Sequence, residues 1–149
     1  LAGMAKAGET YKVTVDYTQT LKQMIAKGKY NYANSDINQS NFPFIGNGKQ
    51  EVVIELVHFG RDMGSEAVLK EFESRGLRAA TLPELLAFGA TYPNKQYEFP
   101  IITLGSVWQH RSGYRYVSDL GGDGSERRLY LCWYDYRWDG RCRFAAVRK

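Results

Sequence analysis

Cysteine is scarce in this 149-residue chain, and no spacing typical of a metal site occurs. Cys132 and Cys142 are too few for a disulfide framework, so we expect two free thiols, with pairing across a hairpin as the alternative. With His58 and His110 they would supply four zinc ligands, but no CxxC or HxxxH spacing is present, so no metal site is expected. A chain of this length can bury a sufficient core, and we expect its stability to need neither a metal nor a disulfide.

Long apolar runs are also missing. No stretch approaches the roughly 18 to 20 apolar residues of a membrane-spanning helix, and residues 1–4 lack the basic and apolar regions of a secretory signal. We expect a soluble protein without a membrane span, in the cytoplasm or displayed at the cell surface, with export through a removed leader left open. The length, and the absence of repeats and linkers, indicate a single domain over residues 1–149.

The sequence also lacks catalytic motifs. The cluster at residues 121–124 (Gly-Gly-Asp-Gly) lacks the Lys-Ser/Thr of a phosphate-binding loop and precedes no helix, so it predicts a hairpin turn. His110 lies near a loop, but one histidine without a placed carboxylate or nucleophile is not a catalytic site. No nucleophile-elbow pattern occurs either. We therefore expect no enzyme activity, no catalytic residue and no cofactor.

Periodicity and capping residues predict three helices followed by strands. Thr20, Ser65 and Thr81 each begin a helix, and the third helix runs through Phe88. Strands are expected at residues 10–17, 51–59, 99–104, 107–110, 114–118, 129–134 and 143–147. This order predicts an α+β fold with helices packed on a mainly antiparallel sheet.

The whole net charge of +4 falls in the last 42 residues. Residues 1–107 carry 11 basic and 11 acidic side chains, whereas residues 108–149 carry nine basic and five acidic ones. The same segment holds nine of the 21 aromatic residues, and arginine with aromatics is the composition of binding surfaces. Because the arginines alternate with aspartates and form no run, nucleic acid is the less favoured partner. An aromatic-rich core with a solvated charged face is the alternative.

The C-terminal third uses a restricted set of residues. Between His110 and Arg148 there is no Lys, Met or Gln and only one Glu, although the first 109 residues use all four types. Along residues 129–134 two faces alternate: Leu129, Leu131 and Trp133 on one, and Tyr130, Cys132 and Tyr134 on the other. The first face is typical of a core. The second lacks the Thr, Lys and Glu of an ordinary solvated sheet face.

Four segments carry a resemblance to a known family. They are LYLCWYDYRWDGRCRFAAVRK at 129–149, ATLPELLAF at 80–88, FPIITLGS at 99–106 and VWQ at 107–109. In these segments the chain resembles the variable proteins of diversity-generating retroelements, of the nanoarchaeal type. The resemblance covers most of the chain from Tyr11 and is strongest from residue 80 onward. It implies a C-type lectin fold, in the broad sense shared with formylglycine-generating enzymes, with a variable ligand-binding region at about 110–142.

The resemblance also implies how that region varies. In this family a reverse transcriptase copies a template RNA with errors at adenines, and Asn codons become NNY codons, which never encode Lys, Glu, Gln, Met or Trp. The depletion described above agrees with this rule. The implied ligand-binding positions, expected on one exposed face and facing an unknown ligand that we expect to be a protein, are Tyr114, Tyr116, Ser118, Tyr130, Cys132, Tyr134, Tyr136, Arg137, Gly140, Arg141 and Cys142. The residues expected to be buried beneath them as scaffold are Trp108, Trp133, Trp138 and Phe144.

Two related chemistries are not implied. Trp133-Tyr134-Asp135 only superficially resembles the Trp-Asn-Asp of calcium-dependent lectins, and the disulfide staples of those lectins are missing. Formylglycine-generating enzymes bind copper through a specific cysteine pair, whereas Cys132 and Cys142 fall at positions expected to vary. We therefore expect a non-enzymatic binding scaffold. A conventional C-type lectin-like binder of a carbohydrate or small ligand is the second interpretation, and a formylglycine-generating-enzyme-like catalyst is the third.

Overall fold

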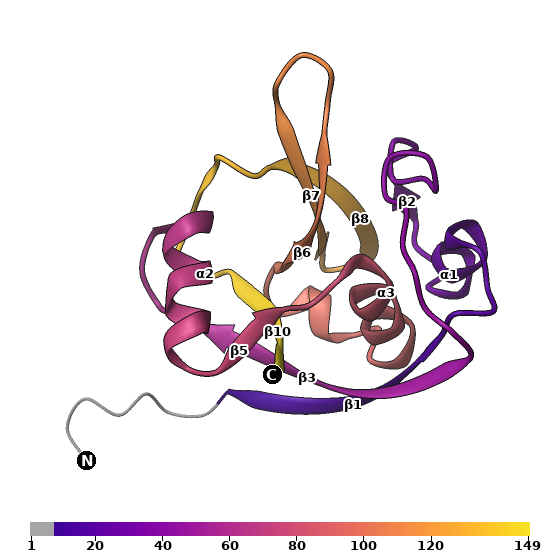
Figure 1. The fold of residues 1–149 in the computed structure, drawn as a ribbon, viewed down its shortest axis with the longest axis horizontal. Helices are drawn as coiled ribbons and strands as arrows, with labels where there is room; N and C mark the ends of the chain where they lie inside the picture. The colour runs from indigo at the N-terminus through magenta and orange to yellow at the C-terminus, as the bar shows by residue number, and fades with distance from the viewer. Residues whose placement is uncertain (1–7) are drawn as a thin grey trace.

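A computed structural model describes residues 8–149 as a twisted sheet with helices on both of its faces (Figure 1). The helices are α1 (Leu21–Lys27), α2 (Ser65–Ser74) and α3 (Leu82–Thr91), with a 3-10 turn η1 at Lys95–Tyr97. The strands are β1 (Glu9–Asp16), β2 (Tyr32–Ala33), β3 (Lys49–His58), β4 (Met63–Gly64), β5 (Leu77–Ala79), β6 (Ile101–Gln109), β7 (Arg115–Asp123), β8 (Glu126–Trp133), β9 (Arg137–Trp138) and β10 (Arg143–Arg148).

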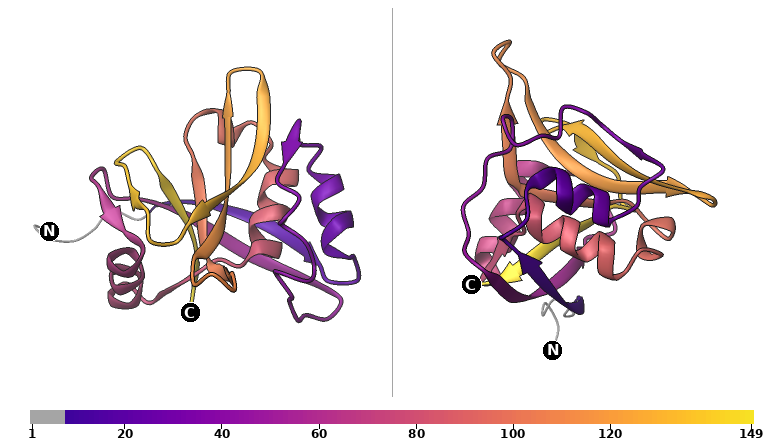
Figure 2. Two further views of the ribbon diagram at one scale, coloured as in Figure 1. Left: turned by 90° about the horizontal axis from the view of Figure 1, so that it is seen from above. Right: turned by 90° about the vertical axis from the view of Figure 1, so that its right-hand side faces the viewer.

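In the large sheet, β1 and β10 both pair with β3. Its strand order is β1-β3-β10-β6-β7-β8-β2, with β5 paired to β10, and β4 and β9 form a separate two-stranded sheet. The pairs β10–β6 and β2–β8 are parallel, and the other pairs are antiparallel. An α+β fold with a mainly antiparallel sheet was predicted, and both features are present. Figure 2 shows the β6–β7 and β7–β8 hairpins projecting in different directions.

The helix boundaries agree with the capping analysis at two of three starts. Thr20 and Thr81 each form a capping box, with Gln23 and Glu84. The second start is one residue earlier than predicted, because Gly64 is the N-cap of α2 and Ser65 lies inside the helix. Ser65 is the first residue of α2, and its buried hydroxyl donates a hydrogen bond to the backbone carbonyl of Tyr134 at 2.6 Å. The third helix continues beyond Phe88 to Thr91.

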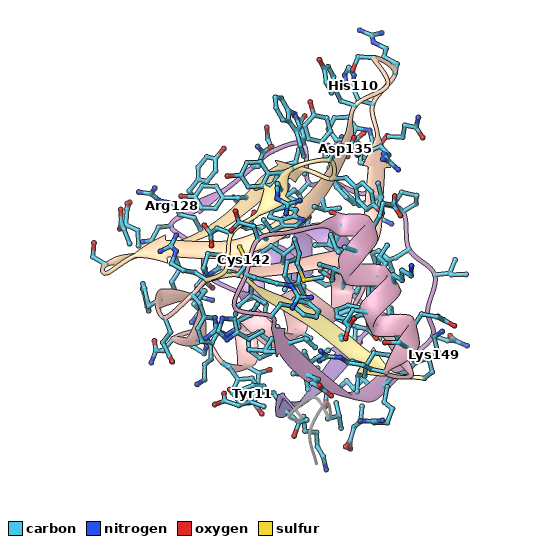
Figure 3. The ribbon with its side chains drawn as sticks, turned by 90° about the vertical axis from the view of Figure 1, so that its left-hand side faces the viewer. Tyr11, His110, Arg128, Asp135, Cys142 and Lys149 are labelled. Carbon is cyan, nitrogen blue, oxygen red and sulfur yellow. The ribbon has the colours of Figure 1, made fainter. Side chains whose placement is uncertain are left out.

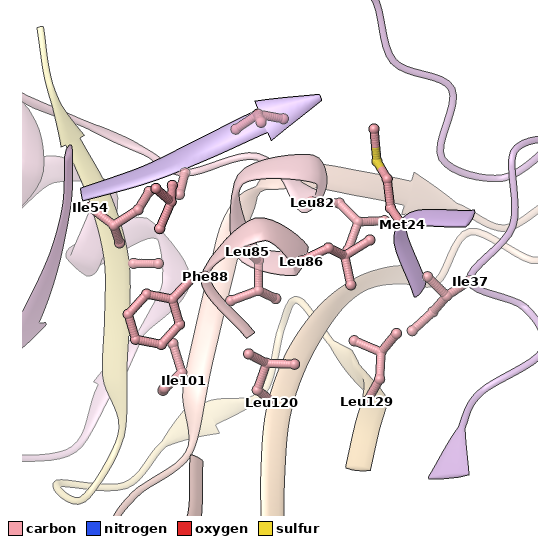
Figure 4. Packing of buried hydrophobic residues seen from close by; sticks show 14 of the residues in the cluster. Met24, Ile37, Ile54, Leu82, Leu85, Leu86, Phe88, Ile101, Leu120 and Leu129 are labelled. Atoms are coloured by element: carbon pink, nitrogen blue, oxygen red, sulfur yellow. The ribbon is translucent and has the colours of Figure 1, made fainter. Parts of the chain in front are cut away.

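Two apolar clusters bury opposite faces of the sheet. On one face, α1 and α3 pack against β6, β7 and β8 (Figure 4), and the labelled side chains are Met24, Ile37, Ile54, Leu82, Leu85, Leu86, Phe88, Ile101, Leu120 and Leu129. On the other face, α2 and the β9 segment pack through Val68, Phe72, Ile102, Val117, Trp138 and Phe144. The central strands are therefore covered on both sides.

One buried arginine joins β8 to the ends of two helices. The Arg127 guanidinium donates hydrogen bonds to the carbonyl oxygens of Pro93 at 2.8 Å and Gly89 at 2.7 Å, and also to that of Gly28. Gly28 is the C-cap of α1 and Gly89 lies in the last turn of α3, where carbonyls lack partners within the helix and carry partial negative charge. The guanidinium carbon also lies 4.7 Å from the ring centre of Tyr30.

The hairpin turn predicted at the glycine cluster is present, although it is shorter than the cluster. Gly121 and Gly122 belong to β7, and the chain reverses at Gly124, which has a φ of +42°, and Ser125. None of the helices in residues 8–149 is long and apolar enough to cross a membrane.

Three of the four predicted scaffold aromatics lie at least partly inside the protein. Trp138 and Phe144 are buried, with 3% and 2% of their surface exposed, and Trp108 is half-buried. The prediction for Trp133 is wrong, because its side chain is 54% exposed. Trp133 is on the same face of β8 as Leu129 and Leu131, but it is the last residue of the strand and extends beyond the core.

The two tryptophans provide a matched test of this packing. We expect Trp138→Ala to lower the free energy of unfolding by roughly 3 to 5 kcal/mol, as removal of a buried aromatic does. Trp133→Ala should change it by about 0.5 kcal/mol, as exposed substitutions usually do. Chemical denaturation of both variants measures this. Equal losses would contradict the assigned packing.

Candidate ligand-binding surface

The β6–β7 hairpin and the turn after β8 meet at one end of the molecule. The backbone N–H of Tyr134 donates to the carbonyl of Arg115 at 2.9 Å, and the Arg115 Nη2 atom lies 2.6 Å from Asp135 Oδ1. In Figure 3, His110 and Asp135 lie near this end, whereas Tyr11 and Lys149 lie at the other. We call the accessible side chains here the end surface, which consists of Tyr114, Tyr116, Trp133, Asp135, Tyr136 and Arg137.

Aromatic rings pack against one another on the end surface. The rings of Tyr114 and Trp133 are stacked, with centroids 5.7 Å apart and planes at 10°. Tyr116 lies against Trp108 at 5.3 Å, and Trp108 also contacts His110 at 5.3 Å. Because each ring is held by a neighbour, the aromatic area is presented with little freedom left to lose on binding. Trp133 was predicted as buried scaffold, so residue alternation alone missed its place on this surface.

Tyr134 is a structural residue, contrary to its prediction as an exposed ligand contact. Its side chain is 5% exposed, and its hydroxyl donates to Glu66 Oε1 at 3.0 Å. The Arg115 guanidinium covers the ring at 4.2 Å, and the Tyr134 backbone carbonyl accepts the Ser65 hydroxyl. The same hydroxyl accepts a hydrogen bond from Trp138 Nε1 at 2.9 Å. Tyr134 therefore fixes the turn under the end surface to α2.

Ser118 and Cys142 are also buried, which corrects their prediction as exposed positions. Ser118 is fully buried because it lies in the middle of β7, between Thr103 on β6 and Leu131 on β8. Cys142 is 6% exposed and packs in the same apolar cluster as α2. This burial raises the pKa of the Cys142 thiol to about 11.

Tyr130 and Cys132 lie on the opposite face of the sheet from Tyr116 and Ser118. Strand pairing places Tyr116 and Ser118 opposite Trp133 and Leu131, on the face that Tyr130 and Cys132 do not share. Tyr130 accepts a hydrogen bond from Arg128 Nη1 at 2.9 Å. The expectation of one common exposed face is therefore wrong, because period-two alternation sends neighbouring strand positions to opposite sides.

Gly140 and Arg141 belong to the loop that passes the end of β3. The carbonyl of Gly140 lies 2.8 Å from His58 Nε2, and a Cβ at Gly140 would lie 3.1 Å from the backbone of Gly60 and Arg61. Gly140 is thus closely packed, which leaves little room for a side chain. Arg141 is exposed, as are Tyr136 and Arg137.

Asp119 is a buried acidic residue that sequence reasoning missed. Its side chain is 7% exposed, and its Oδ1 atom accepts a hydrogen bond from the Cys132 thiol at 3.1 Å. Burial raises the pKa of Asp119 to about 6, partly offset by that hydrogen bond. Burial and the neighbouring Asp119 carboxylate raise the pKa of the Cys132 thiol. The sequence did contain a signal for this buried carboxylate, because Asp119 lies between the apolar residues Val117 and Leu120.

The described residues provide no evident metal site. Both cysteines are free thiols in the structure. Within residues 8–149, no group of three or more His, Cys, Asp or Glu side chains is placed to hold a metal ion.

Comparison with known proteins adds no assignment. No protein-family model, curated protein or solved structure matches the chain.

Two tyrosines in the same turn test which residues support the end surface. Tyr134→Ser should lower the free energy of unfolding by roughly 3 to 5 kcal/mol, because it removes a buried aromatic ring and the hydrogen bond to Glu66. Tyr136→Ser, at a residue that is 53% exposed, should cost about 0.5 kcal/mol. Thermal or chemical unfolding compares the two. If Tyr134→Ser left the free energy of unfolding unchanged, Tyr134 would again count among the positions that are free to vary.

Asp119 should make stability depend on pH. Its pKa is raised in the folded state, so between about pH 4 and 6 the native protein binds more protons than the unfolded chain. Stability therefore falls as pH rises through this window, by roughly 3 kcal/mol at about 1.4 kcal/mol per pKa unit. Asp119→Asn should remove that fall and be the more stable protein at pH 7.5. Denaturation at several pH values measures this, and an unchanged pH profile would contradict the assignment.

Proposed function

We propose that this chain is a diversity-generating retroelement variable protein with a C-type lectin fold, a non-enzymatic scaffold that binds a protein ligand. The observation that carries the proposal is the end surface itself. Exposed Tyr114, Tyr136 and Arg137 lie in the segment where the residue usage is restricted, and the Tyr114 ring is stacked on the exposed ring of Trp133. The α+β architecture is compatible with the proposed fold.

Packing separates residues that are free to vary from residues that are not. The exposed members of the set expected from sequence are Tyr114, Tyr136, Arg137 and Arg141. Tyr116, Tyr130 and Cys132 are half-buried, and Tyr116 is on β7, two residues from Tyr114. Tyr134, Ser118 and Cys142 are buried, and a Cβ at Gly140 would lie only 3.1 Å from backbone atoms of Gly60 and Arg61. The proposed variable surface is therefore smaller than the set expected from sequence.

Residue chemistry favours a protein as the ligand. Tyrosine offers a rigid ring and a hydrogen-bonding hydroxyl at low entropic cost, which is why antibody binding sites use it so often. Arginine adds planar, bidentate hydrogen bonding and stacking. Arg115 is paired with Asp135, whereas among residues 8–149 Arg137 has no acidic partner within 4.0 Å and is free to pair with a ligand.

Two matched libraries test the proposal. One randomises Tyr114, Tyr116, Tyr136, Arg137 and Arg141 with NNY codons, and the other randomises Ser118, Tyr134, Gly140 and Cys142 in the same way. Most members of the first library should fold and most of the second should not, because only the second changes buried or closely packed positions. Soluble yield and thermal melting of sampled clones measure this.

The first library is then selected against several unrelated protein targets. The proposal predicts distinct clones for distinct targets, with unchanged folding. If every binder recognised one carbohydrate or small ligand regardless of sequence, the conventional lectin-like alternative would replace it. Turnover of a substrate by the parent chain would support the enzyme alternative.

A further inference from the structure

The outer edge of β8 is paired along only part of its length. The short strand β2 pairs with β8 at Arg128 and Leu129 and no further. A turn then leads the chain away, because Asn34 accepts hydrogen bonds from Asp36 N–H at its side chain (2.9 Å) and from Ile37 N–H at its carbonyl (3.1 Å). Figure 1 shows β2 beside only one part of β8. Among residues 8–149, no strand lies next to the edge from Tyr130 to Trp133.

The backbone groups on this edge follow from the contacts that β8 makes earlier. Arg127 donates its backbone N–H to Asn31 Oδ1 at 2.7 Å and accepts from Asn31 N–H at 2.8 Å. The Leu129 carbonyl accepts from Asn34 N–H at 3.0 Å. Odd-numbered residues of β8 thus direct their backbone groups away from β7, and the two-residue period places Leu131 and Trp133 in the same series.

Leu131 and Trp133 have backbone hydrogen-bonding groups without a partner in residues 8–149. The Trp133 carbonyl accepts from Tyr136 N–H at 3.1 Å. Within residues 8–149, the N–H and carbonyl of Leu131 and the N–H of Trp133 have no protein partner. Two donors and one acceptor therefore point outward along one side of an extended strand.

The edge also lacks the features that keep exposed strands apart. Natural proteins protect such edges with charged residues, especially lysine, with proline or with bulges. The segment from Tyr130 to Trp133 contains neither a charge nor a proline, and it pairs regularly with β7. The exposed Trp133 ring and the half-buried Tyr130 ring flank it on opposite faces.

We propose that an extended segment of a partner protein binds here as an added strand beside Leu131–Trp133. An extended polypeptide presents N–H and carbonyl groups at the spacing of the free groups, which is the basis of recognition by strand addition. Backbone hydrogen bonds do not depend on side-chain identity, so this contact would persist while the end surface changed. The inference rests on the proposed function in one respect, that the ligand is a polypeptide.

Peptide selection with a backbone-specific pair of variants tests the proposal. Linear random 12-residue peptides displayed on phage are selected against the full chain, and enriched peptides are measured with Leu131→Ala and Leu131→Pro. Both variants lose the leucine side chain, but only proline removes the outward N–H, and the ladder to β7 does not use that group. We expect Leu131→Ala to bind within about threefold of the parent and Leu131→Pro to bind about tenfold more weakly or worse.

Amide hydrogen exchange in the parent chain gives a second readout that needs no variant. The N–H groups of Leu131 and Trp133 should exchange rapidly in the free protein, while those of Tyr130 and Cys132, which face β7, should be slow. Bound peptide should protect Leu131 and Trp133.

Three results would overturn the proposal. One is a selection that enriches no peptide. Another is peptides that bind without protecting either amide, which would leave the proposed function standing. The third is concentration-dependent protection in the free protein, which would assign the edge to a second copy of this chain.

Discussion

Burial of both faces of β7 is the constraint on which the rest of the structure depends. Helices α1 and α3 cover one face and α2 with the β9 segment covers the other, so a side chain in the middle of β7 is buried whichever way it points. Ser118, Val117 and Leu120 are all fully buried for this reason. A ligand can therefore contact this part of the sheet at the ends of the strands, at the turns and at the unpaired edge of β8.

The same constraint divides the arginines of the C-terminal third into two groups. Arg127 is buried and satisfies carbonyls at the ends of two helices, and Arg115 packs on Tyr134 and pairs with Asp135. These residues hold the hairpin and the turn in place. Arg137 and Arg141 are exposed and face solvent. Part of the basic excess is therefore structural, and only the remainder is available to a partner.

Local signals predicted the three helices well because capping and periodicity act within a few residues. The capping boxes at Thr20 and Thr81 and the hairpin at the glycine cluster illustrate this. In contrast, the strands predicted at 99–104 and 107–110 form the single strand β6, and the short strands β2, β4, β5 and β9 were missed. The site was harder to predict, because alternation says which residues share a face but not whether anything covers it. Tyr134 was predicted to be exposed and Trp133 to be buried, and the structure shows the opposite. Tyr134 is covered by α2, where its partner Glu66 is 68 residues distant in sequence, and Trp133 lies at the end of β8, beyond the core. Asp119 was missed because its burial depends on the packing of one face of the sheet, which its neighbours in sequence do not reveal.

The central claim is that variation is confined to positions that packing leaves free. Sequencing sister copies of this gene from one population tests it most directly. The account predicts clustered changes at Tyr114, Tyr116, Tyr136, Arg137 and Arg141, with Tyr134, Trp138 and Phe144 constant. Changes scattered evenly along the chain, or a constant end surface in every copy, would contradict it.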